Sequence, residues 1–468
     1  MSKISASRNK QCHKAWRTTI SAALSMLFLL SGCIPFFDIQ PTAASSTPSV
    51  DLSTTPPLIS EALVTFNVEI PPIQKNEPTI YIDILDEVTG LALNPARYKM
   101  TEVDAQHYRI QLPEKLGELI RYRYVQGGDN PVPEYSTAGH QVRYRLLDVT
   151  APTTVDDIVS AWIDTPYKKP VGQISGRVVD ADNEAPIPNA LVCAGGLQVF
   201  TSTDGTFVLD GLPSGVHNLV AITLDGSYSV FQQGARVVDG FSTPAVIKMK
   251  KAKMVSVTFI VSIPPEILGV PVRLAGDLYS LGDTFTDLSG GVSVIASHMP
   301  VLTPLANGRQ TITLQLPSGA DLHYKYTIGD GFWNAEHSKA GNFVLRDMII
   351  PDQDTTVENT VATWSSGQKP PITFNLTVPD DTPSTDDMSV QFNPYGWTEP
   401  IPMWSVGKNK WMYVLFSPYN LVKEFSYRYC RNDQCGVADN STTGDSISDW
   451  KVTVGGIPQT FNDVISQW

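Results

Sequence analysis

The chain has 468 residues, a length that predicts roughly two to five domains rather than one compact core. Acidic residues outnumber basic ones by 47 to 34, and the resulting net charge of −13 excludes nucleic acid and anionic lipid headgroups as electrostatic partners. The 35 Pro and 33 Gly favour short strands and turns over long helices. We therefore expect a mostly β protein of several domains.

The amino terminus predicts a secretory signal. Five basic side chains precede an apolar run from Ile20 to Leu30, which is too short to span a bilayer as a helix. At the end of the run, Leu30-Ser31-Gly32-Cys33 resembles the lipobox of bacterial lipoproteins. The resemblance implies that Cys33 is acylated and becomes the new amino terminus, so that the lipid bilayer is a partner. The alternative is an ordinary cleaved signal with an incidental Cys.

The residues after Cys33 predict an anchored tether. Residue 34 is Ile rather than Asp, which by resemblance to the sorting rule of double-membraned bacteria points to the outer membrane. From Pro41 to Leu58 the chain is almost wholly Pro, Thr, Ser and Ala, a composition that cannot bury enough apolar surface to fold. We expect a cell-envelope protein that faces the exterior and is held off its membrane.

Three segments repeat the same order of features, which predicts three related domains. Each opens with an alternating apolar strand, later has an aromatic-base-aromatic triplet, and closes on a Trp. The opening Phe and the closing Trp are 96, 105 and 94 residues apart, about the size of a two-sheet sandwich. The repeated residues are Val64-Thr65-Phe66, Tyr122-Arg123-Tyr124 and Trp162; Val257-Thr258-Phe259, Tyr324-Lys325-Tyr326 and Trp364; Ile372-Thr373-Phe374, Tyr427-Arg428-Tyr429 and Trp468. We expect the closing Trp residues to lie in the cores.

A different pattern lies between the first and second repeats. Ile174-Ser175-Gly176-Arg177-Val178 is followed by alternating strands joined through Asp204-Gly205 and Pro213-Ser214-Gly215, which supply tight turns. Residues 171–250 resemble the carboxypeptidase regulatory-like domain. The resemblance implies a small transthyretin-like sandwich that acts as a spacer, with a binding role as the alternative.

The second repeat resembles the family 20 starch-binding carbohydrate-binding module over about 110 residues. The resemblance rests on the order of the opening strand, Leu281-Gly282-Asp283, Tyr324-Lys325-Tyr326 and the closing Trp364. In that family two aromatic rings form a platform for glucose units, and a Lys donates hydrogen bonds to sugar hydroxyls. Carried over, these roles fall to Phe285, Trp333 and Lys325, with Phe285 standing where the family has Trp.

Further residues complete the candidate carbohydrate site. A flat ring buries the C–H face of a sugar while neighbouring polar groups bind its hydroxyls. In the second repeat these polar groups are Asn334, Glu336 and Asn342. In the third, Trp397 takes the first platform position, Trp404 follows, and Arg428 replaces the Lys. The alternative for Trp333 is packing in a loop at the edge of the sandwich, and the first repeat, which lacks both platform aromatics, is expected to be a spacer.

No motif for catalysis or metal binding is present in the sequence, so we expect no enzyme activity, no cofactor and no metal site. Asp180, Asp182 and Glu184 have the first spacings of a calcium loop, but Ala185 and Leu191 replace its Gly and its bidentate Glu. This segment is therefore predicted to be a hairpin turn.

Cys430 and Cys435 bracket four residues at the tip of a predicted hairpin. Outside the cytoplasm, where disulfides persist, this spacing predicts a disulfide bond. A metal site is the alternative, but it would favour closer spacing and a second Cys pair.

The sequence thus predicts an all-β chain of tandem immunoglobulin-like, starch-binding-like sandwiches with one transthyretin-like sandwich inserted between the first and second. The expected parts are a lipoprotein signal at 1–32, a tether at 33–60, sandwiches at 61–165, 253–367 and 368–468, and the insert at 171–250.

Two functions are compatible with this organisation. The first is a surface lipoprotein that binds an α-glucan or related polysaccharide. The alternative is a structural or adhesive stalk whose partner is protein. Because the first two repeats continue into linkers and the chain stops on Trp468, a third hypothesis makes it the front part of a longer protein with a glycoside hydrolase.

The lipobox resemblance predicts that Cys33 carries lipid. Mass spectrometry of the membrane fraction is expected to find an acylated amino-terminal peptide that begins at Cys33, and Cys33→Ser is expected to abolish it. A mature chain that begins elsewhere and is released in soluble form would contradict the prediction.

Overall fold

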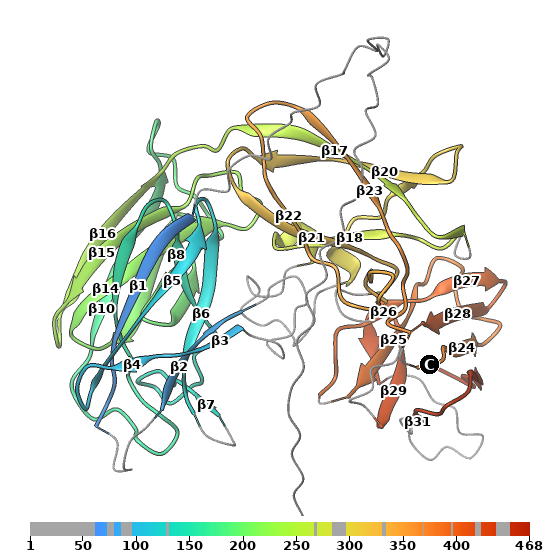
Figure 1. The fold of residues 1–468 in the computed structure, drawn as a ribbon, viewed down its shortest axis with the longest axis horizontal. Helices are drawn as coiled ribbons and strands as arrows, with labels where there is room; N and C mark the ends of the chain where they lie inside the picture. Colours follow the sequence, from blue (N-terminus) through green and yellow to red (C-terminus); the bar gives the residue numbers. More distant parts are fainter. Residues whose placement is uncertain are drawn as a thin grey trace, which may run out of the picture. The chain divides into compact units, whose positions relative to one another are not determined.

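Figure 1 shows the fold in a computed structural model that describes residues 61–72, 79–85, 96–127, 131–265, 269–282, 296–329, 334–367, 369–394, 396–416, 423–436 and 450–468. Within these ranges the secondary structure is β strand, apart from two short 3₁₀ helices, η2 (Tyr279–Leu281) and η3 (Ala296–His298). The expected all-β fold is confirmed. No helix in this part of the chain has the length and apolar character needed to cross a bilayer.

The first repeat forms two facing sheets, here called sandwich 1. Its strands are β1 (Glu61–Glu69), β2 (Ile80–Ile84), β3 (Ala96–Lys99), β4 (Thr101–Glu102), β5 (His107–Lys115), β6 (Leu119–Gln126), β7 (Val132–Pro133), β8 (Arg145–Asp148) and β9 (Thr153–Ile158). One sheet has the order β4-β5-β1-β9 and the other β3-β2-β6-β7, with β8 also paired to β6. In β1 the buried side chains alternate with more exposed ones, and Val64 and Phe66 enter the core between the sheets.

The second repeat, sandwich 2, has the same arrangement. Its strands are β17 (Met254–Ser262), β18 (Arg273–Gly276), β19 (Thr303–Pro304), β20 (Arg309–Pro317), β21 (Asp321–Thr327), β22 (Arg346–Ile349) and β23 (Thr355–Thr360). The sheets have the orders β19-β20-β17-β23 and β18-β21-β22. The central strand β17 is antiparallel to β20 and parallel to β23, as β1 is to β5 and β9.

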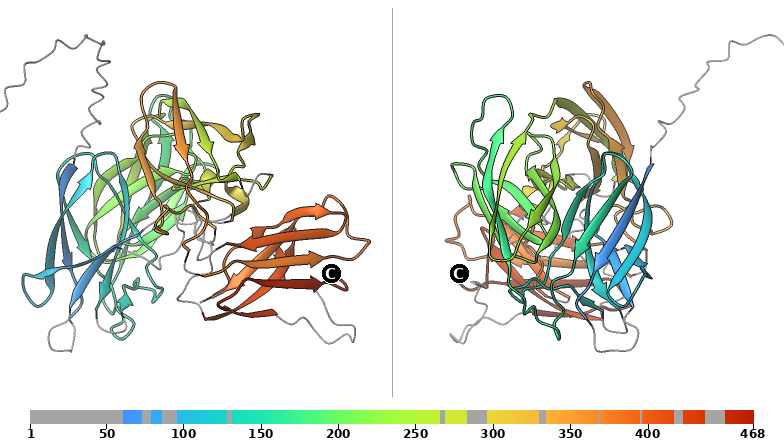
Figure 2. Two further views of the ribbon diagram at one scale, coloured as in Figure 1. Left: turned by 45° about the vertical axis from the view of Figure 1, so that its right-hand side comes forward. Right: turned by 90° about the vertical axis from the view of Figure 1, so that its left-hand side faces the viewer.

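The third repeat, sandwich 3, follows this order again, and Figure 2 shows its orange and red strands running side by side. Its strands are β24 (Ile372–Thr377), β25 (Met388–Asn393), β26 (Ile401–Pro402), β27 (Trp404–Gly407), β28 (Lys410–Leu415), β29 (Glu424–Arg431), β30 (Gln434–Cys435), β31 (Trp450–Thr453) and β32 (Gln459–Val464). The sheets are β27-β28-β24-β32 and β26-β25-β29-β30, with β31 paired to β29.

Between sandwiches 1 and 2 the chain forms a smaller sandwich, here called the insert domain. Its strands are β10 (Gly172–Asp180), β11 (Ala190–Ala194), β12 (Leu197–Phe200), β13 (Thr206–Leu212), β14 (Gly215–Thr223), β15 (Phe231–Val237) and β16 (Ser242–Met249). They form sheets β13-β10-β16 and β12-β11-β14-β15 around a core of their own. Gly176 is required in β10, because an added Cβ would lie 1.7 Å from the carbonyl oxygen of Ala245 on β16.

The aromatic-base-aromatic triplets place two tyrosines on one face of a strand in each sandwich. In sandwich 1 the hydroxyls of Tyr122 and Tyr124, on β6, both donate to one carboxylate oxygen of Asp157, on β9, at 2.8 Å. Because β6 and β9 belong to opposite sheets, the three side chains join the two sheets. We call this arrangement the tyrosine clasp.

The clasp recurs in the other two sandwiches with the same geometry. Tyr324 and Tyr326 donate to Asn359 at 3.1 and 2.9 Å, and Tyr427 and Tyr429 donate to Asp463 at 2.8 and 2.7 Å. Burial raises the pKa of these phenols above its ordinary value, so each hydroxyl stays protonated and remains a donor.

The closing tryptophans lie five residues after the clasp acceptors. Trp162 and Trp364 are almost fully buried, as the sequence predicts for core residues. Trp468 differs, because it is only partly buried and its indole nitrogen donates to the hydroxyl of Thr382 at 3.0 Å. It therefore seals the edge of the core.

Removing one clasp hydroxyl is expected to lower the free energy of unfolding by different amounts in sandwich 1 and in sandwich 2. Tyr124→Phe removes a bond to a carboxylate, which is expected to destabilise sandwich 1 by about 1.5–3 kcal/mol, whereas Tyr326→Phe removes a bond to a neutral amide and is expected to cost about 0.5–1.5 kcal/mol. Differential scanning calorimetry of the full chain measures both, with the exposed Tyr98→Phe as the control. Equal effects of all three variants would contradict a stabilising role for the clasp.

Candidate functional site

The aromatic residues of the second repeat's predicted platform, Phe285 and Trp333, lie outside the described residues. Lys325 is described, and it lies in the middle of β21 with only 1% of its surface exposed. Its ammonium nitrogen lies 5.6 Å above the ring centre of Phe343. This position corrects the expectation that Lys325 donates hydrogen bonds to a sugar, because a bound ligand could not reach a side chain so deeply covered.

Glu336 is fully buried and serves the fold of sandwich 2. Its carboxylate accepts hydrogen bonds from the backbone N–H of Tyr326 at 2.9 Å and from Arg346 at 3.0 and 2.7 Å. Glu134 occupies the same place in sandwich 1, where it accepts from the N–H of Tyr124 and from Arg145. The predicted sugar-binding role of Glu336 is therefore corrected as well.

Asn334 is 3% exposed and joins sandwich 2 to sandwich 3. Its side-chain amide donates to the hydroxyl of Tyr413 at 2.9 Å and to the carbonyl of Val414 at 2.7 Å. Its amide oxygen accepts from the backbone N–H of Phe416 at 2.8 Å. All three partners lie in or next to β28, so both N–H donors of the side chain are used, and its burial keeps sugar hydroxyls away from the amide oxygen.

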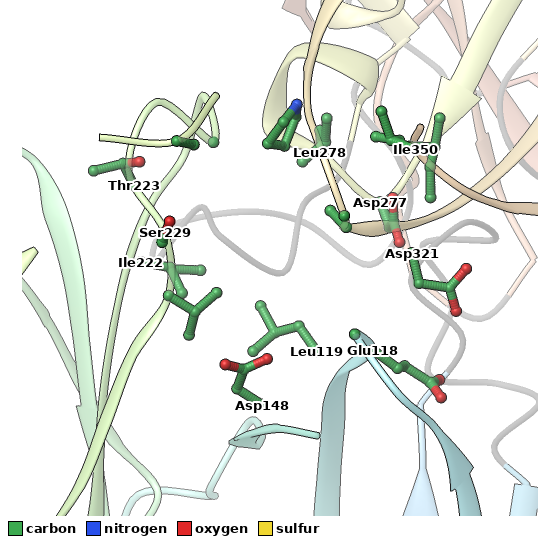
Figure 3. Close-up of a pocket in the computed structure, with 18 of the residues that line it drawn as sticks. Glu118, Leu119, Asp148, Ile222, Thr223, Ser229, Asp277, Leu278, Asp321 and Ile350 are labelled. Carbon is green, nitrogen blue, oxygen red and sulfur yellow. The ribbon is translucent and has the colours of Figure 1, made fainter. Parts of the chain in front are cut away.

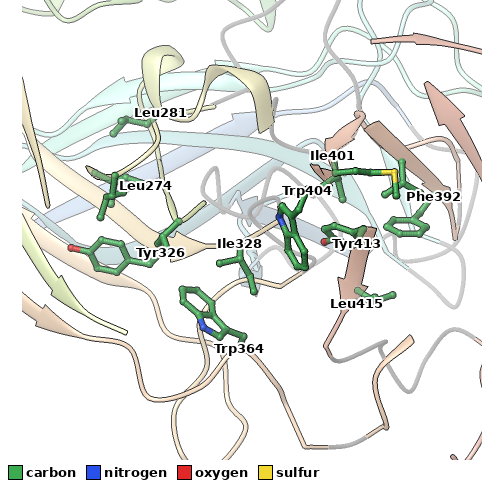
Figure 4. Close-up of a cluster of buried hydrophobic side chains, with 14 of the residues drawn as sticks. Leu274, Leu281, Tyr326, Ile328, Trp364, Phe392, Ile401, Trp404, Tyr413 and Leu415 are labelled. Carbon is green, nitrogen blue, oxygen red and sulfur yellow. The ribbon is translucent and has the colours of Figure 1, made fainter. Parts of the chain in front are cut away.

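Trp404 belongs to the same contact. Its ring centre lies 5.4 Å from that of Tyr413, and 9% of its surface is exposed. Figure 4 shows Trp404 and Tyr413 between Ile328 and Trp364 on one side and Phe392 and Leu415 on the other. These side chains form one continuous buried cluster across sandwiches 2 and 3. Trp404 is thus part of a joint rather than a free binding surface.

The structure brings two predicted residues together in sandwich 3. The guanidinium carbon of Arg428 lies 4.0 Å from the ring centre of Trp397, close enough for a cation–π contact. Arg428 also donates to the side-chain oxygen of Gln391, directly opposite it on β25, at 2.7 Å. Trp397 is only partly buried. This cluster, the Trp397 platform, is the predicted carbohydrate surface that remains accessible in the described part of sandwich 3.

Three further predictions concern a disulfide and two turns. Cys430 and Cys435 form the expected disulfide between β29 and β30. Asn342 lies exposed in a turn, where its N–H donates to the Ser338 hydroxyl at 3.3 Å. Asp180 accepts hydrogen bonds from the N–H groups of Asp182 and Asn183, which fits the predicted hairpin turn.

Sequence reasoning did not anticipate the joint between sandwich 1 and the insert domain. Tyr144 and Leu146 of sandwich 1 pack with Leu191, Val220 and Ile222 of the insert domain in a buried apolar cluster. Hydrogen bonds border this cluster, from Gln198 to the Tyr144 carbonyl at 2.8 Å, from Asn218 to the Leu146 carbonyl at 3.0 Å, and between Gln232 and the backbone of Asp148 in both directions. The signal in the sequence is the unbroken apolar run Ala190–Ala194, which is buried on both faces.

Comparison with known proteins identifies one segment. Residues 173–250 match the family model of the carboxypeptidase regulatory-like domain, which confirms the expectation for the insert domain. A search of curated proteins finds no match for the chain.

Several solved structures align with parts of the chain. The Bacillus anthracis TIE protein is 12% identical, covers 90% of this chain and 76% of its own, and has a TM-score of 0.17. A streptococcal ancillary pilin is 12% identical, with 64% and 99% coverage and a TM-score of 0.23. A family 15 glucoamylase from Hypocrea jecorina is 17% identical, with 25% and 20% coverage and a TM-score of 0.18. Because these TM-scores are far below 0.5, the alignments carry no information about function.

The joint at Asn334 predicts a local change in hydrogen exchange. Asn334 has a positive φ of 60°, which Gly adopts without strain. Asn334→Gly therefore removes the three side-chain hydrogen bonds without disturbing the backbone. The Phe416 N–H then loses its acceptor. If the free energy of local opening falls by about 1–3 kcal/mol, the amide hydrogens of a peptide containing residues 414–416 are expected to exchange about tenfold faster or more. Mass spectrometry of deuterated full chain provides the measurement.

The matched control is Asn409→Gly, which also has a positive φ but makes one exposed hydrogen bond inside sandwich 3. It should leave the exchange of residues 414–416 unchanged. Equal exchange in wild type and Asn334→Gly would mean that Asn334 does not hold the joint.

Proposed function

We propose that this chain is a non-catalytic stalk of the bacterial cell envelope. In this proposal Cys33 carries the lipid anchor, residues 33–60 form the tether, and the β domains hold a partner-binding surface at a fixed distance outside the membrane. The observation that carries it is the use of predicted ligand-binding side chains as joints, above all the three hydrogen bonds from Asn334 to sandwich 3.

Buried joints distinguish a stalk from a string of independent binding modules. Modules that move independently are usually joined by exposed, polar linkers with few contacts across them. Here sandwiches 2 and 3 share one apolar cluster, and sandwich 1 shares another with the insert domain. Burial of apolar surface at each joint stabilises a fixed arrangement by roughly 25 cal/mol for each Å² removed from water. This supports a role in setting distance.

Polysaccharide binding is the second candidate, and the Trp397 platform supports it. A partly buried Trp beside a guanidinium held by Gln391 combines a ring face with hydrogen-bond donors, the groups that sugar recognition uses. The two functions are compatible, because a stalk can carry a weak glycan site on its third sandwich. Over the whole chain acidic side chains outnumber basic ones by 47 to 34, a balance that disfavours nucleic acid as a partner.

The stalk proposal is tested by measuring a distance across a joint. Thr356 on β23 and Ser405 on β27 are exposed positions on sandwiches 2 and 3, and a spin label can be attached to each as Cys. Double electron–electron resonance is expected to give one narrow distance distribution for this pair, and a broad one for a pair with one label at Ser53 in the tether. A broad distribution for the first pair would contradict the proposal.

Pull-down of the same chain with starch and with a β-glucan tests the second candidate separately. Binding that is lost in Trp397→Ala, with thermal unfolding unchanged, would assign glycan recognition to the platform. Binding that survives in Trp397→Ala would place it elsewhere.

A further inference from the structure

A cavity of about 380 Å³ lies where sandwich 1, the insert domain and sandwich 2 meet. Figure 3 shows its walls, with Glu118, Leu119 and Asp148 from sandwich 1, Ile222 and Ser229 from the insert domain, and Leu278 and Asp321 from sandwich 2. The volume is within the range of small-molecule sites, which is about 300–1,000 Å³. None of the functions considered above uses it.

The wall of the cavity has two chemically different parts. Leu119, Ile222 and Leu278 supply apolar surface, and in Figure 3 Leu119 and Ile222 border the central space. Glu118, Asp148 and Asp321 supply carboxylates. A ligand that fits both parts needs an apolar body and a positive charge.

Asp321 is a second, independent observation that points to a cation-binding site. Its side chain is 1% exposed, yet neither carboxylate oxygen accepts a hydrogen bond within the described part of the chain. The nearest basic groups are Nε2 of the His323 ring at 3.4 Å and the ammonium of Lys115 at 3.9 Å, and Lys115 makes its shorter contact with Asp347. A buried carboxylate without donors is costly, because it has lost its hydration without replacement.

The other charged and titratable groups on the wall leave an excess of acid. They are Arg121, Asp277, His323 and the phenol of Tyr228. Nδ1 of the His323 ring lies 3.6 Å from a carboxylate oxygen of Asp277. Burial raises the pKa of Glu118 and of Asp321, and it raises the pKa of Asp148 to about 6. A cation inside the cavity would favour their ionised forms.

We propose that this cavity binds a small organic amine, whose ammonium contacts Asp321 and Glu118 and whose apolar body lies against Leu119, Ile222 and Leu278. An ammonium group supplies N–H donors of the kind that the Asp321 carboxylate lacks, and one of its three N–H groups can also bind Glu118. A metal ion fits less well, because no group of three or more His, Cys, Asp or Glu side chains in the described ranges is arranged to hold one. The ligand is therefore an amine with an apolar part, small enough for 380 Å³.

The test uses 2-phenylethylamine as the probe and 2-phenylethanol as its neutral counterpart. Isothermal titration calorimetry of the full chain in detergent at pH 7.5, with both probes up to millimolar concentration, is expected to detect the amine and not the alcohol. Asp321→Asn and Glu118→Gln keep the side-chain shapes, and each is expected to weaken amine binding about tenfold or more, because each removes a charge-assisted hydrogen bond. Asp148→Asn provides a third variant if either of these fails to fold.

The matched control is Asp347→Asn, which neutralises an acid close to Asp321 that does not line the cavity. It should leave amine binding within twofold of wild type. No binding of the amine, equal binding of the amine and the alcohol, or equal weakening by Asp347→Asn and Asp321→Asn would each overturn the proposal. The last result would mean that only the general negative charge attracts the probe.

Discussion

The tyrosine clasp is the interaction on which the three sandwiches depend. A carboxylate or amide inside a β sandwich is costly unless it accepts hydrogen bonds, and the two phenols supply two donors to one of its oxygens from a single strand. Since the acceptor lies on the strand that runs parallel to the opening strand, the clasp fixes how one sheet faces the other. The rings also pack edge to face, at 5.9, 6.1 and 5.8 Å between centroids in the three copies.

Differences around this common frame give the copies separate tasks. In sandwich 1 the carboxylates of Glu134 and Asp157 share Arg145, whereas in sandwich 2 Asn359 replaces the second carboxylate and Arg346 pairs with Glu336 alone. In sandwich 3 the base of the triplet, Arg428, reaches the Trp397 ring instead. Around the shared clasp, sandwich 1 thus has a buried charge network, sandwich 2 has one ion pair, and sandwich 3 has an arginine–tryptophan contact made by the base of its triplet.

The sequence was sufficient to predict the β architecture, the threefold repeat, the insert domain and the disulfide, because each depends on local pattern or on spacing. It was not sufficient to predict burial at the second repeat's site. Lys325, Asn334 and Glu336 have the composition of a sugar site, but their surroundings include residues up to 82 positions away, such as Phe416. One signal was available, because Glu134-Tyr135-Ser136 and Glu336-His337-Ser338 align as repeats, and a residue shared with a spacer domain is more consistent with a structural role.

The location of the cysteines affects how the disulfide can form while the chain folds. Cys193 is buried in the joint between sandwich 1 and the insert domain, and burial raises the pKa of its thiol well above the usual value, so it stays protonated and unreactive once folded. The native disulfide joins residues only five positions apart on paired strands. The two thiols are therefore close together in the chain before the domain has folded. A wrong disulfide with Cys193 can form only before the joint between sandwich 1 and the insert domain has closed. In an oxidising compartment, closure of that joint therefore protects the thiol.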